Sequence, residues 1–576
     1  MGGFDADVAD APSVLHPGLL ESLAADLAAL NYTVGGVADF VGQEAYAALN
    51  RDQLVPVLLV CEEELRAAAP SPLVVPILLW LVGGTLTQDQ LDLAFPITGA
   101  DGLQALRLID PVGAPVPDTL RRAAVELRPY SSDADGDLWV ASDLGALQRP
   151  GVLRHDHVLG IGGASLTLAQ ITVRPRVRTA LDLGTGCGIQ TFHLLSHAEH
   201  VTATDISPRA LAFTRFNLLL NAGPLGIDPG ALDARVSLRL GSLLEPVAGQ
   251  RFDLVVSNPP FVITPRSTEE SPEDQFTYRD GGLPGDDIVS GLLASLPGVL
   301  AEGGTAQLLG NWEIPAGREW DERLREWLPE GTDAWIIQRE VQSPLQYAET
   351  WLRDAAENRD RAAYFKRYAD YLGDFASRAV DSVGFGYIWL RRTPGGAPAW
   401  VRCEEITHEV EQPLGPHLGA AVERGDWLAS AAPGGAGTQP DLTGRDENGP
   451  DLTAPDLTGP DQNVANPNRT NQQAPGRDLN WEYLLVAGDV TEERHQRPGA
   501  EHPGVILLRQ GAGLRRTTLL STELAGFVSA CDGDLTAGQI AGALAVLLGE
   551  DGPDFVPDLL AMAGRLVLEG FLIPAP

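Results

Sequence analysis

The tetrapeptide Asn258-Pro259-Pro260-Phe261 directly follows an apolar run, Phe252 to Ser257, which its composition predicts to be a buried β-strand. Neither proline can donate a backbone hydrogen bond, so the chain must leave the sheet at Asn258, the carboxyl end of the strand, where open α/β sheets bind ligands. The Asn258 side-chain oxygen and the Pro259 carbonyl could accept both hydrogens of a planar NH2 group, with Phe261 stacked on its flat face. The lone pair of such a group is delocalised, so the chemistry these residues suit is turning a poor nucleophile toward an electrophile.

A glycine-rich turn at residues 181 to 189 lies between a predicted strand and a predicted helix. Glycines there let the backbone approach a ligand closely, and their Gly-x-Gly-x-Gly spacing differs from the Gly-x-Gly-x-x-Gly of hydride-transfer enzymes. Asp205 ends the next strand, about 20 residues on, where a carboxylate can accept from both hydroxyls of a ribose. The predicted cofactor contacts are Asp182, Gly184, Gly186, Gly188, Asp205, Ile206, Gly241, Ser242 and Asn258.

The two motifs follow the first and the fourth predicted strands, in an order that resembles the class I S-adenosylmethionine-dependent N-methyltransferases. The resemblance covers about residues 153 to 390. It implies S-adenosylmethionine as the cofactor and methyl transfer to a planar amino or amide nitrogen. It also implies that the catalytic residues are Asn258, Pro259, Pro260 and Phe261. An in-line displacement from an activated sulfonium needs no metal and no covalent enzyme intermediate.

Two branches of that superfamily remain open for the acceptor. The motif is similar to that of ribosomal RNA guanine-N2 methyltransferases, which tend to carry Phe at the last position. It is also similar to the HemK-type glutamine methyltransferases that modify release factors, which usually have Tyr where this chain has Phe261. The acceptor is therefore a nucleobase of RNA or DNA, or a protein glutamine. A rival of another class is a regulator that binds the cofactor without reacting, but it would not need an intact acceptor motif.

The elements that position these residues alternate between strand and helix from Thr179 onward, which requires a parallel sheet with right-handed crossovers. The predicted fold class is α/β, a Rossmann-like seven-stranded methyltransferase domain. The predicted strands are residues 179–183, 201–205, 236–240, 252–257, 305–309, 334–337 and 387–390. A pair of helices is expected between residues 345 and 380. The Gly-, Ser- and Thr-rich segment within 152–178 is expected to cross the mouth of the domain, and residues 276–282, including Tyr278, Arg279 and Asp280, to form a lid.

Four regions follow from the pattern along the chain. Residues 1–150 form an N-terminal helical or winged-helix-like domain, and residues 151–395 form the methyltransferase domain. Residues 396–430 and 479–576 form a small C-terminal winged-helix-like domain. Residues 431–478 are rich in Gly, Pro, Asp, Asn and Gln and repeat Pro-Asp-Leu-Thr, so they are expected to be a disordered insertion. The two flanking domains serve either substrate recognition or packing.

Composition limits the partners. Lys and Arg number 41 against 78 Asp and Glu, a net charge of −37, which disfavours unspecific attachment to nucleic acid. A local arginine surface such as Arg174, Arg176 and Arg178 could reverse that preference. The four cysteines are far apart, which predicts no metal site and a reducing cytoplasm, and no apolar run reaches the ~20 residues of a membrane span. The expected partner is a macromolecular substrate, RNA or a translation factor, with no membrane association and with the oligomeric state left open.

Overall fold

The computed structural model describes residues 4–113, 120–132, 136–145, 147–149, 154–266, 282–354, 361–396, 399–430, 476–550 and 552–576. Of the expected insertion only residues 476–478 are among them, and of the expected lid only Gly282, so both expectations lie outside the described residues. The chain divides into two compact units. The first holds the N-terminal part and residues 175–332 and 340–395, and the second holds residues 170–174, 333–339 and 396–576.

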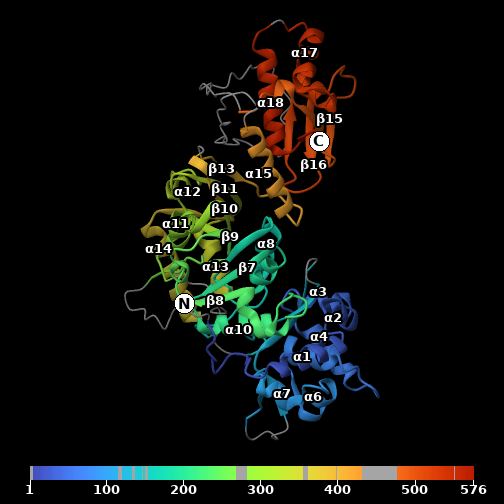
Figure 1. Cartoon of the computed structure of the whole chain (residues 1–576), viewed down its shortest axis with the longest axis vertical. Helices are drawn as coiled ribbons and strands as arrows, with labels where there is room; N and C mark the ends of the chain where they lie inside the picture. The colour runs from blue at the N-terminus through green and yellow to red at the C-terminus, as the bar shows by residue number, and fades with distance from the viewer. Residues whose placement is uncertain are drawn as a thin grey trace. The chain divides into compact units, whose positions relative to one another are not determined.

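The central sheet has the strand order β13-β11-β12-β10-β9-β6-β7-β8 (Figure 1). Strands β6 to β10 run parallel, with β6 between β7 and β9, so the chain reverses its direction of travel through the sheet at this point. Such a reversal is the switch point at which doubly wound sheets bind ligands. All seven predicted strands are present, which confirms the Rossmann-like fold. Their bounds are β6 Val177–Leu183, β7 Ala198–Asp205, β8 Val236–Leu240, β9 Phe252–Ser257, β10 Leu300–Pro315, β11 Thr332–Gln342 and β12 Val380–Arg392.

An eighth strand, β13 (Val401–Glu405), was not expected, and it comes from the segment that the sequence assigned to the C-terminal domain. It pairs in parallel with β11. Its sequence lacks an apolar alternation because Arg402 and Glu404, both buried, form an ion pair within it. A strand whose buried side chains are paired charges has no hydrophobic pattern, so it could not be predicted from hydrophobicity.

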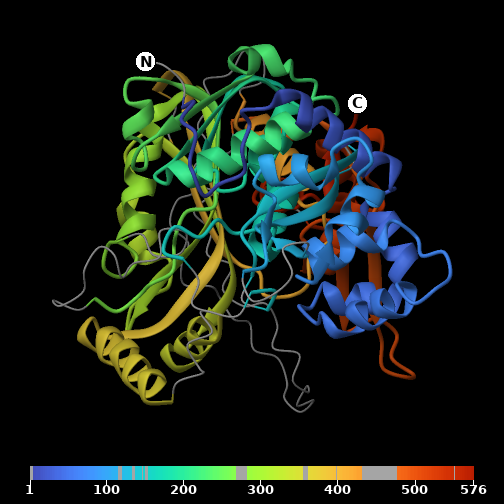
Figure 2. The ribbon, with the colours of Figure 1, turned by 90° about the horizontal axis from the view of Figure 1, so that it is seen from below.

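Helices flank the sheet (Figure 2). Their bounds are α8 Gly163–Ile171, α9 Ile189–Leu195, α10 Pro208–Leu220, α11 Asp287–Ser295 and α12 Glu322–Trp327. Every residue of α9 is buried. In α10 the Ser207 hydroxyl accepts a hydrogen bond from the Ala210 N–H and Pro208 follows, an N-terminal cap that starts the helix directly after Asp205.

The N-terminal part is mainly helical, as expected. Its helices are α1 Pro17–Ala29, α2 Val34–Val41, α3 Gln43–Leu49, α4 Val55–Glu64, α5 Val74–Pro76, α6 Gln88–Ala94 and α7 Gly99–Ala105. The side chains of Tyr32, Trp80 and Phe95 are fully buried and pack on one another in its core. A small sheet has the order β1-β3-β2, from strands Thr85–Thr87, Leu120–Ala123 and Ile109–Pro111.

A hairpin of β4 (Glu126–Ser132) and β5 (Gly136–Ser142) joins this part to α10. Two buried asparagines, Asn217 in α10 and Asn221 at the C-terminal cap of that helix, take the place of a neighbouring strand along β5. The Asn221 amide bonds both the N–H and the carbonyl of Trp139 at 2.8 and 2.7 Å. The Asn217 amide bonds the N–H and the carbonyl of Ala141 at 2.8 and 2.9 Å. The edge of the hairpin is thus satisfied without another strand.

The predicted pair of helices between β11 and β12 is confirmed as α13 (Pro344–Asp354) and α14 (Arg361–Ser377), which lie side by side (Figure 1). They share an apolar cluster with β12 in which Tyr347, Tyr371 and Phe375 are buried. This connection leaves the sheet at the carboxyl end of β11.

The second unit contains α15 (Gly415–Ala429), a sheet β18-β14-β19 and a sheet β15-β16-β17. Three further helices, α16 (Thr522–Ser529), α17 (Ala537–Leu548) and α18 (Phe555–Glu569), pack around Phe527 and Phe571 in a core to which both sheets contribute. The strands are β14 Tyr483–Val486, β15 Val490–His495, β16 Val505–Gln510, β17 Thr517–Leu520, β18 Asp532–Thr536 and β19 Leu572–Pro574. A recognition role for this unit stays a prediction.

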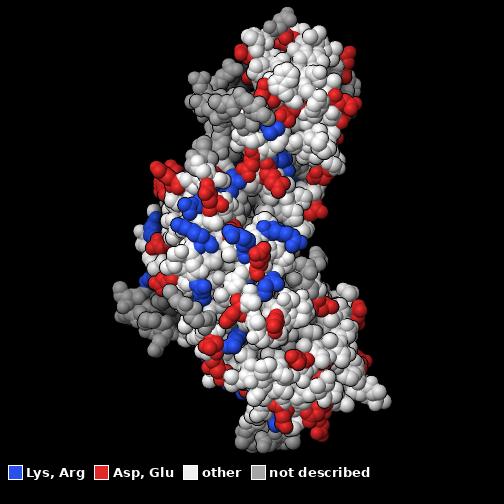
Figure 3. All heavy atoms as spheres, viewed as in Figure 1, with Lys and Arg blue, Asp and Glu red and all other residues white. Residues whose placement is uncertain are grey.

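Figure 3 shows Lys and Arg side chains gathered over the strands of the central sheet, among Asp and Glu side chains spread over the rest of that face. Arg176 and Arg178 are exposed. No helix in the described residues is both long and apolar enough to cross a membrane.

Candidate active site

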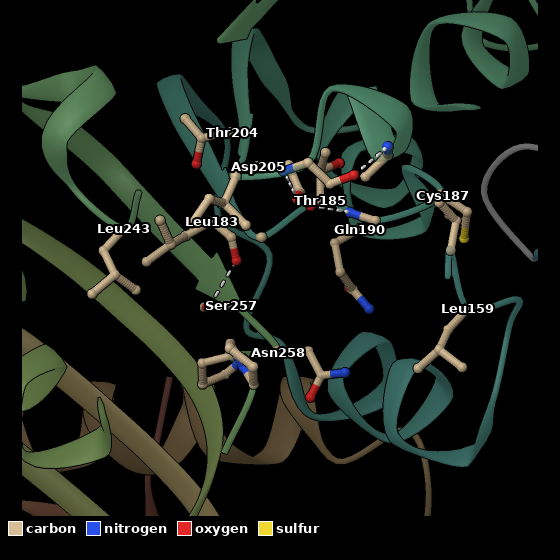
Figure 4. A pocket seen from close by; sticks show the side chains of 18 of the residues that line it. Leu159, Leu183, Thr185, Cys187, Gln190, Thr204, Asp205, Leu243, Ser257 and Asn258 are labelled. Atoms are coloured by element: carbon tan, nitrogen blue, oxygen red, sulfur yellow. Dashed lines mark hydrogen bonds between the residues drawn. The ribbon is translucent and has the colours of Figure 1, made fainter. Parts of the chain in front are cut away.

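A pocket with a cavity volume of about 510 Å³ lies at the carboxyl ends of β6, β7, β8 and β9 (Figure 4). This volume suits a nucleoside-sized ligand. Nine of the sequence-predicted residues line it: Gly184, Gly186, Asp205, Ile206, Gly241, Ser242, Asn258, Pro259 and Pro260. Three lie outside its wall, Asp182, Gly188 and Phe261, and Phe261 is half-buried beside it.

The glycine-rich turn makes room for a ligand. Gly184 and Gly186 have φ of 78° and 58°, in the left-handed region that favours glycine. A Cβ built on either would meet no atom within 4 Å, so both glycines face open space inside the pocket. Gly188 differs, because a Cβ there would lie 3.0 Å from the Thr214 side chain. The first two glycines thus form a cradle, whereas Gly188 serves the packing of α9 on α10.

Asp182 lies beneath this turn and does not reach the pocket. Its Oδ2 accepts hydrogen bonds from the Thr185 and Thr191 hydroxyls, each at 2.7 Å. Burial raises the pKa of the Asp182 carboxyl to about 6, against the lowering effect of these two hydrogen bonds. In the structure the Asp182 carboxylate stabilises the glycine-rich turn through its hydrogen bonds to Thr185 and Thr191.

Asp205 stands on the pocket wall with its carboxylate held in place by the backbone. Its Oδ2 accepts from the Gly186 N–H at 3.0 Å, and its Oδ1 accepts from the Ser207 N–H at 2.8 Å. Burial raises the pKa of Asp205, and the hydrogen bonds from the backbone oppose that rise. Each carboxylate oxygen keeps a second lone pair, which fits the two adjacent hydroxyls of a ribose.

Asn258 presents an acceptor without a partner. Its Oδ1 is buried and accepts no hydrogen bond from the described part of the chain. The preceding Ser257 is fixed, since its hydroxyl donates to the Leu183 carbonyl at 2.8 Å. Figure 4 shows the Asn258 side chain on the wall of the pocket, below Gln190. The pocket thus brings the glycine cradle, Asp205 and the orphan acceptor of Asn258 into one cavity.

The sequence motifs missed one wall of the pocket, residues 157–160, although the segment that follows the N-terminal part was expected to cross the mouth. A buried ion pair holds this wall. The Arg209 guanidinium on α10 binds the Asp143 carboxylate through both of its terminal nitrogens, and Asp143 Oδ2 accepts from the Val158 N–H at 2.8 Å. No local pattern links Asp143 to Arg209, so only the fold could identify the pair.

Gln190 and Cys187 also line the pocket. The Gln190 amide donates to the Ser165 carbonyl at 2.8 Å, tying α9 to the segment across the mouth. Burial raises the pKa of the Cys187 thiol to about 12, so this cysteine is unsuited to nucleophilic catalysis. The described residues contain no group of three or more His, Cys, Asp or Glu side chains placed to hold a metal ion.

Comparison with known families gives a match that includes most of the residues lining this pocket. The family described as "Methyltransferase small domain" matches residues 144–273, and a "Domain of unknown function (DUF7059)" matches residues 29–122. The first match contains the glycine turn, Asp205 and Asn258.

Three curated relatives are similar to part of the chain. A release factor glutamine methyltransferase of Geobacter sulfurreducens is 33% identical over 136 residues, 23% of this chain and 44% of that protein. A ribosomal protein uL3 glutamine methyltransferase of Bradyrhizobium diazoefficiens is 32% identical over 174 residues, 29% of this chain and 50% of that protein. A release factor glutamine methyltransferase of Moorella thermoacetica is 37% identical over 136 residues, 23% of this chain and 44% of that protein. The chain therefore matches half or less of the length of each.

Proposed function

We propose that this chain transfers a methyl group to the side-chain amide nitrogen of a glutamine in a protein of the translation apparatus. Such a substrate would place the reaction in the cytoplasm. The domain built on its central sheet is a class I S-adenosylmethionine-dependent methyltransferase domain.

The observation that carries the proposal is the buried, unpartnered Oδ1 of Asn258. Buried acceptors without a partner are rare, and each costs roughly 1–3 kcal/mol. A substrate N–H that enters the pocket would remove this cost. A carboxamide NH2 has two hydrogens, one for Asn258 Oδ1 and one for the carbonyl of Pro259, and holding both turns the face of the amide, where the nitrogen lone pair lies, toward the cofactor half of the pocket.

The residues of the other half fit the cofactor. The cradle of Gly184 and Gly186 leaves space for it, and Asp205 offers two oriented acceptors to its ribose. S-adenosylmethionine, when bound there, supplies an electrophilic methyl group on a sulfonium. The chain's own task is then to orient the acceptor nitrogen and to exclude water. No strong base is required, because the nitrogen becomes acidic as it is alkylated.

The choice of glutamine over a nucleobase rests on the relatives and on charge. The relatives modify glutamine in release factors or in a ribosomal protein, as their names state. A net charge of −37 opposes a nucleic acid substrate. Stacking of Phe261 on the planar acceptor remains part of the proposal. The alternative of a regulator that binds the cofactor without reacting gives no reason for the orphan acceptor at Asn258.

The test is to incubate the full chain with tritium-labelled S-adenosylmethionine and a cell extract, with Asn258→Ala as the background. Protease digestion of the labelled macromolecules should release the label, and nuclease digestion should not. Label that only nuclease releases would replace glutamine by a nucleobase, and equal labelling by both proteins would remove Asn258 from the reaction.

A further inference from the structure

The helical insertion between β11 and β12 makes direct contact with the loop that follows Asn258. Tyr347, on α13, is fully buried, and its hydroxyl oxygen accepts two hydrogen bonds. One comes from the backbone N–H of Ile263 at 2.8 Å. The other comes from the side-chain amide of Asn311, on β10, at 2.8 Å. A single phenol thus joins the insertion, the central sheet and the loop.

The loop from Asn258 to Ile263 is short and is fixed at both ends. At its start, Ser257 lies in the sheet and donates to the Leu183 carbonyl. At its end, Val262 and Ile263 are buried, so the Ile263 N–H needs a partner inside the protein, and the Tyr347 hydroxyl supplies it. Pro259 and Pro260 restrict the backbone between the two ends. Loss of the second attachment would therefore release the carboxyl side of the segment that carries Asn258 and the Pro259 carbonyl.

The position of the hydroxyl is set by aromatic packing. The Tyr347 ring stacks on Phe385 of β12 at a centroid distance of 5.7 Å and an interplanar angle of 23°. It meets Phe375 of α14 edge-on at 5.4 Å. These rings belong to the apolar cluster shared by α13, α14 and β12, so the phenol cannot move without disturbing the insertion.

We propose that Tyr347 is a positioning residue for methyl transfer, whose hydroxyl holds the Asn258–Ile263 loop in the geometry that grips the acceptor NH2. The insertion of α13 and α14 is then part of the catalytic apparatus. This inference rests on the proposed function for its kinetic consequence, whereas the attachment of the loop does not depend on the identity of the acceptor.

The test compares Tyr347→Phe with Tyr32→Phe in the full chain. Each change keeps the ring and removes one buried hydroxyl, but the Tyr32 hydroxyl donates to the Leu127 carbonyl at 2.7 Å in the N-terminal part and does not line the pocket. For Tyr347→Phe we expect kcat to fall on the order of 10- to 100-fold, since small displacements of reacting groups cost about that much. The Kd of S-adenosylmethionine, measured by calorimetry, should stay within about twofold because Asp205 and the cradle of Gly184 and Gly186 lie on other loops. Tyr32→Phe should lower Tm without a comparable fall in kcat.

Hydrogen exchange supplies a readout that needs no activity. The backbone amide of Ile263 should exchange faster in Tyr347→Phe than in the wild type, while the amides of β9 stay protected. The inference is overturned if that amide keeps its protection, if kcat stays within about twofold of the wild type, or if both variants lose kcat in proportion to Tm. A wild type that transfers no methyl group to protein refutes the proposed function instead, and the exchange experiment still decides the role of Tyr347.

Discussion

Replacement of Asn258 by alanine should separate catalysis from both folding and cofactor binding. The change removes Oδ1, the buried acceptor that has no partner within the described residues. The change breaks no hydrogen bond among the described residues, and burying an unpaired polar atom costs roughly 1–3 kcal/mol. The free energy of unfolding of the variant should therefore equal that of the wild type or exceed it by up to about 1 kcal/mol. Most substitutions in a pocket would lower stability, so this expectation is specific.

The kinetic magnitude follows from the role of the lost acceptor. Removing one oriented hydrogen-bonding group that acts where charge develops costs about 2.7–4 kcal/mol, which corresponds to a fall in kcat on the order of 10²- to 10³-fold. Asp205 and the glycine cradle are unchanged, so the Kd of S-adenosylmethionine should stay within about twofold. Asn258→Asp is the matched variant, because a carboxylate keeps an acceptor at the same place. It should retain more activity than Asn258→Ala.

The assay is single-turnover transfer from tritium-labelled S-adenosylmethionine, with calorimetric cofactor binding and thermal unfolding measured on the same samples. Unchanged turnover in Asn258→Ala would refute the assignment of the acceptor clamp. A large fall in Tm would show that Oδ1 has a structural partner and that the loss of activity is indirect.

Three further changes test the supports of the site. Asp205→Ala should raise the Kd of S-adenosylmethionine on the order of 10²-fold or more, since two charge-assisted hydrogen bonds to the ribose are lost. Undiminished binding in a calorimeter would contradict the assignment of Asp205 to the cofactor site. Because the pKa of Asp182 rises in the folded state from 3.8 to about 6, its stabilising contribution is complete below pH 3.8 and is lost as the pH rises through 6. In urea unfolding, the free energy of unfolding of Asp182→Asn should therefore gain up to about 3 kcal/mol on that of the wild type between pH 4 and 7. A difference between the two proteins that does not vary with pH would contradict this prediction. Asp143→Ala leaves the buried Arg209 guanidinium without its carboxylate, so the free energy of unfolding in urea should fall by about 3–5 kcal/mol. The control Asp156→Ala breaks an exposed ion pair and should cost less than about 1 kcal/mol. Equal costs would mean that the buried pair does not hold the pocket wall.

The parts of this fold that could be predicted are those that local pattern encodes. Strand β9 is a largely apolar run, and the glycine turn and the Asn258-Pro259-Pro260 motif stand at the carboxyl ends of β6 and β9. A parallel sheet brings those ends together, so two motifs far apart in the sequence line one pocket. The insertion of two helices was visible in the same way.

The parts that could not be predicted depend on contacts between distant residues. Asp182 has the position expected of a cofactor ligand, but its carboxylate turns inward to Thr185 and Thr191. Strand β13 is polar because its charges are paired. The bond from Ile263 to Tyr347 joins residues 84 apart in the chain, and nothing near either residue indicates it. Side-chain direction and charge pairing of this kind come from the packed structure alone.

The measurement that tests the central claim most directly is the chemical form of the transferred methyl group. Protein labelled by this chain with tritiated S-adenosylmethionine is hydrolysed completely in acid, which cleaves a side-chain amide but leaves N-methyl groups on lysine, arginine and histidine in place. Methylation of a glutamine amide predicts that the tritium appears as methylamine, which is volatile once the hydrolysate is made alkaline, and that the Asn258→Ala variant yields none. Tritium that stays with a methylated amino acid, or that is found in a methylated nucleobase, would contradict the account.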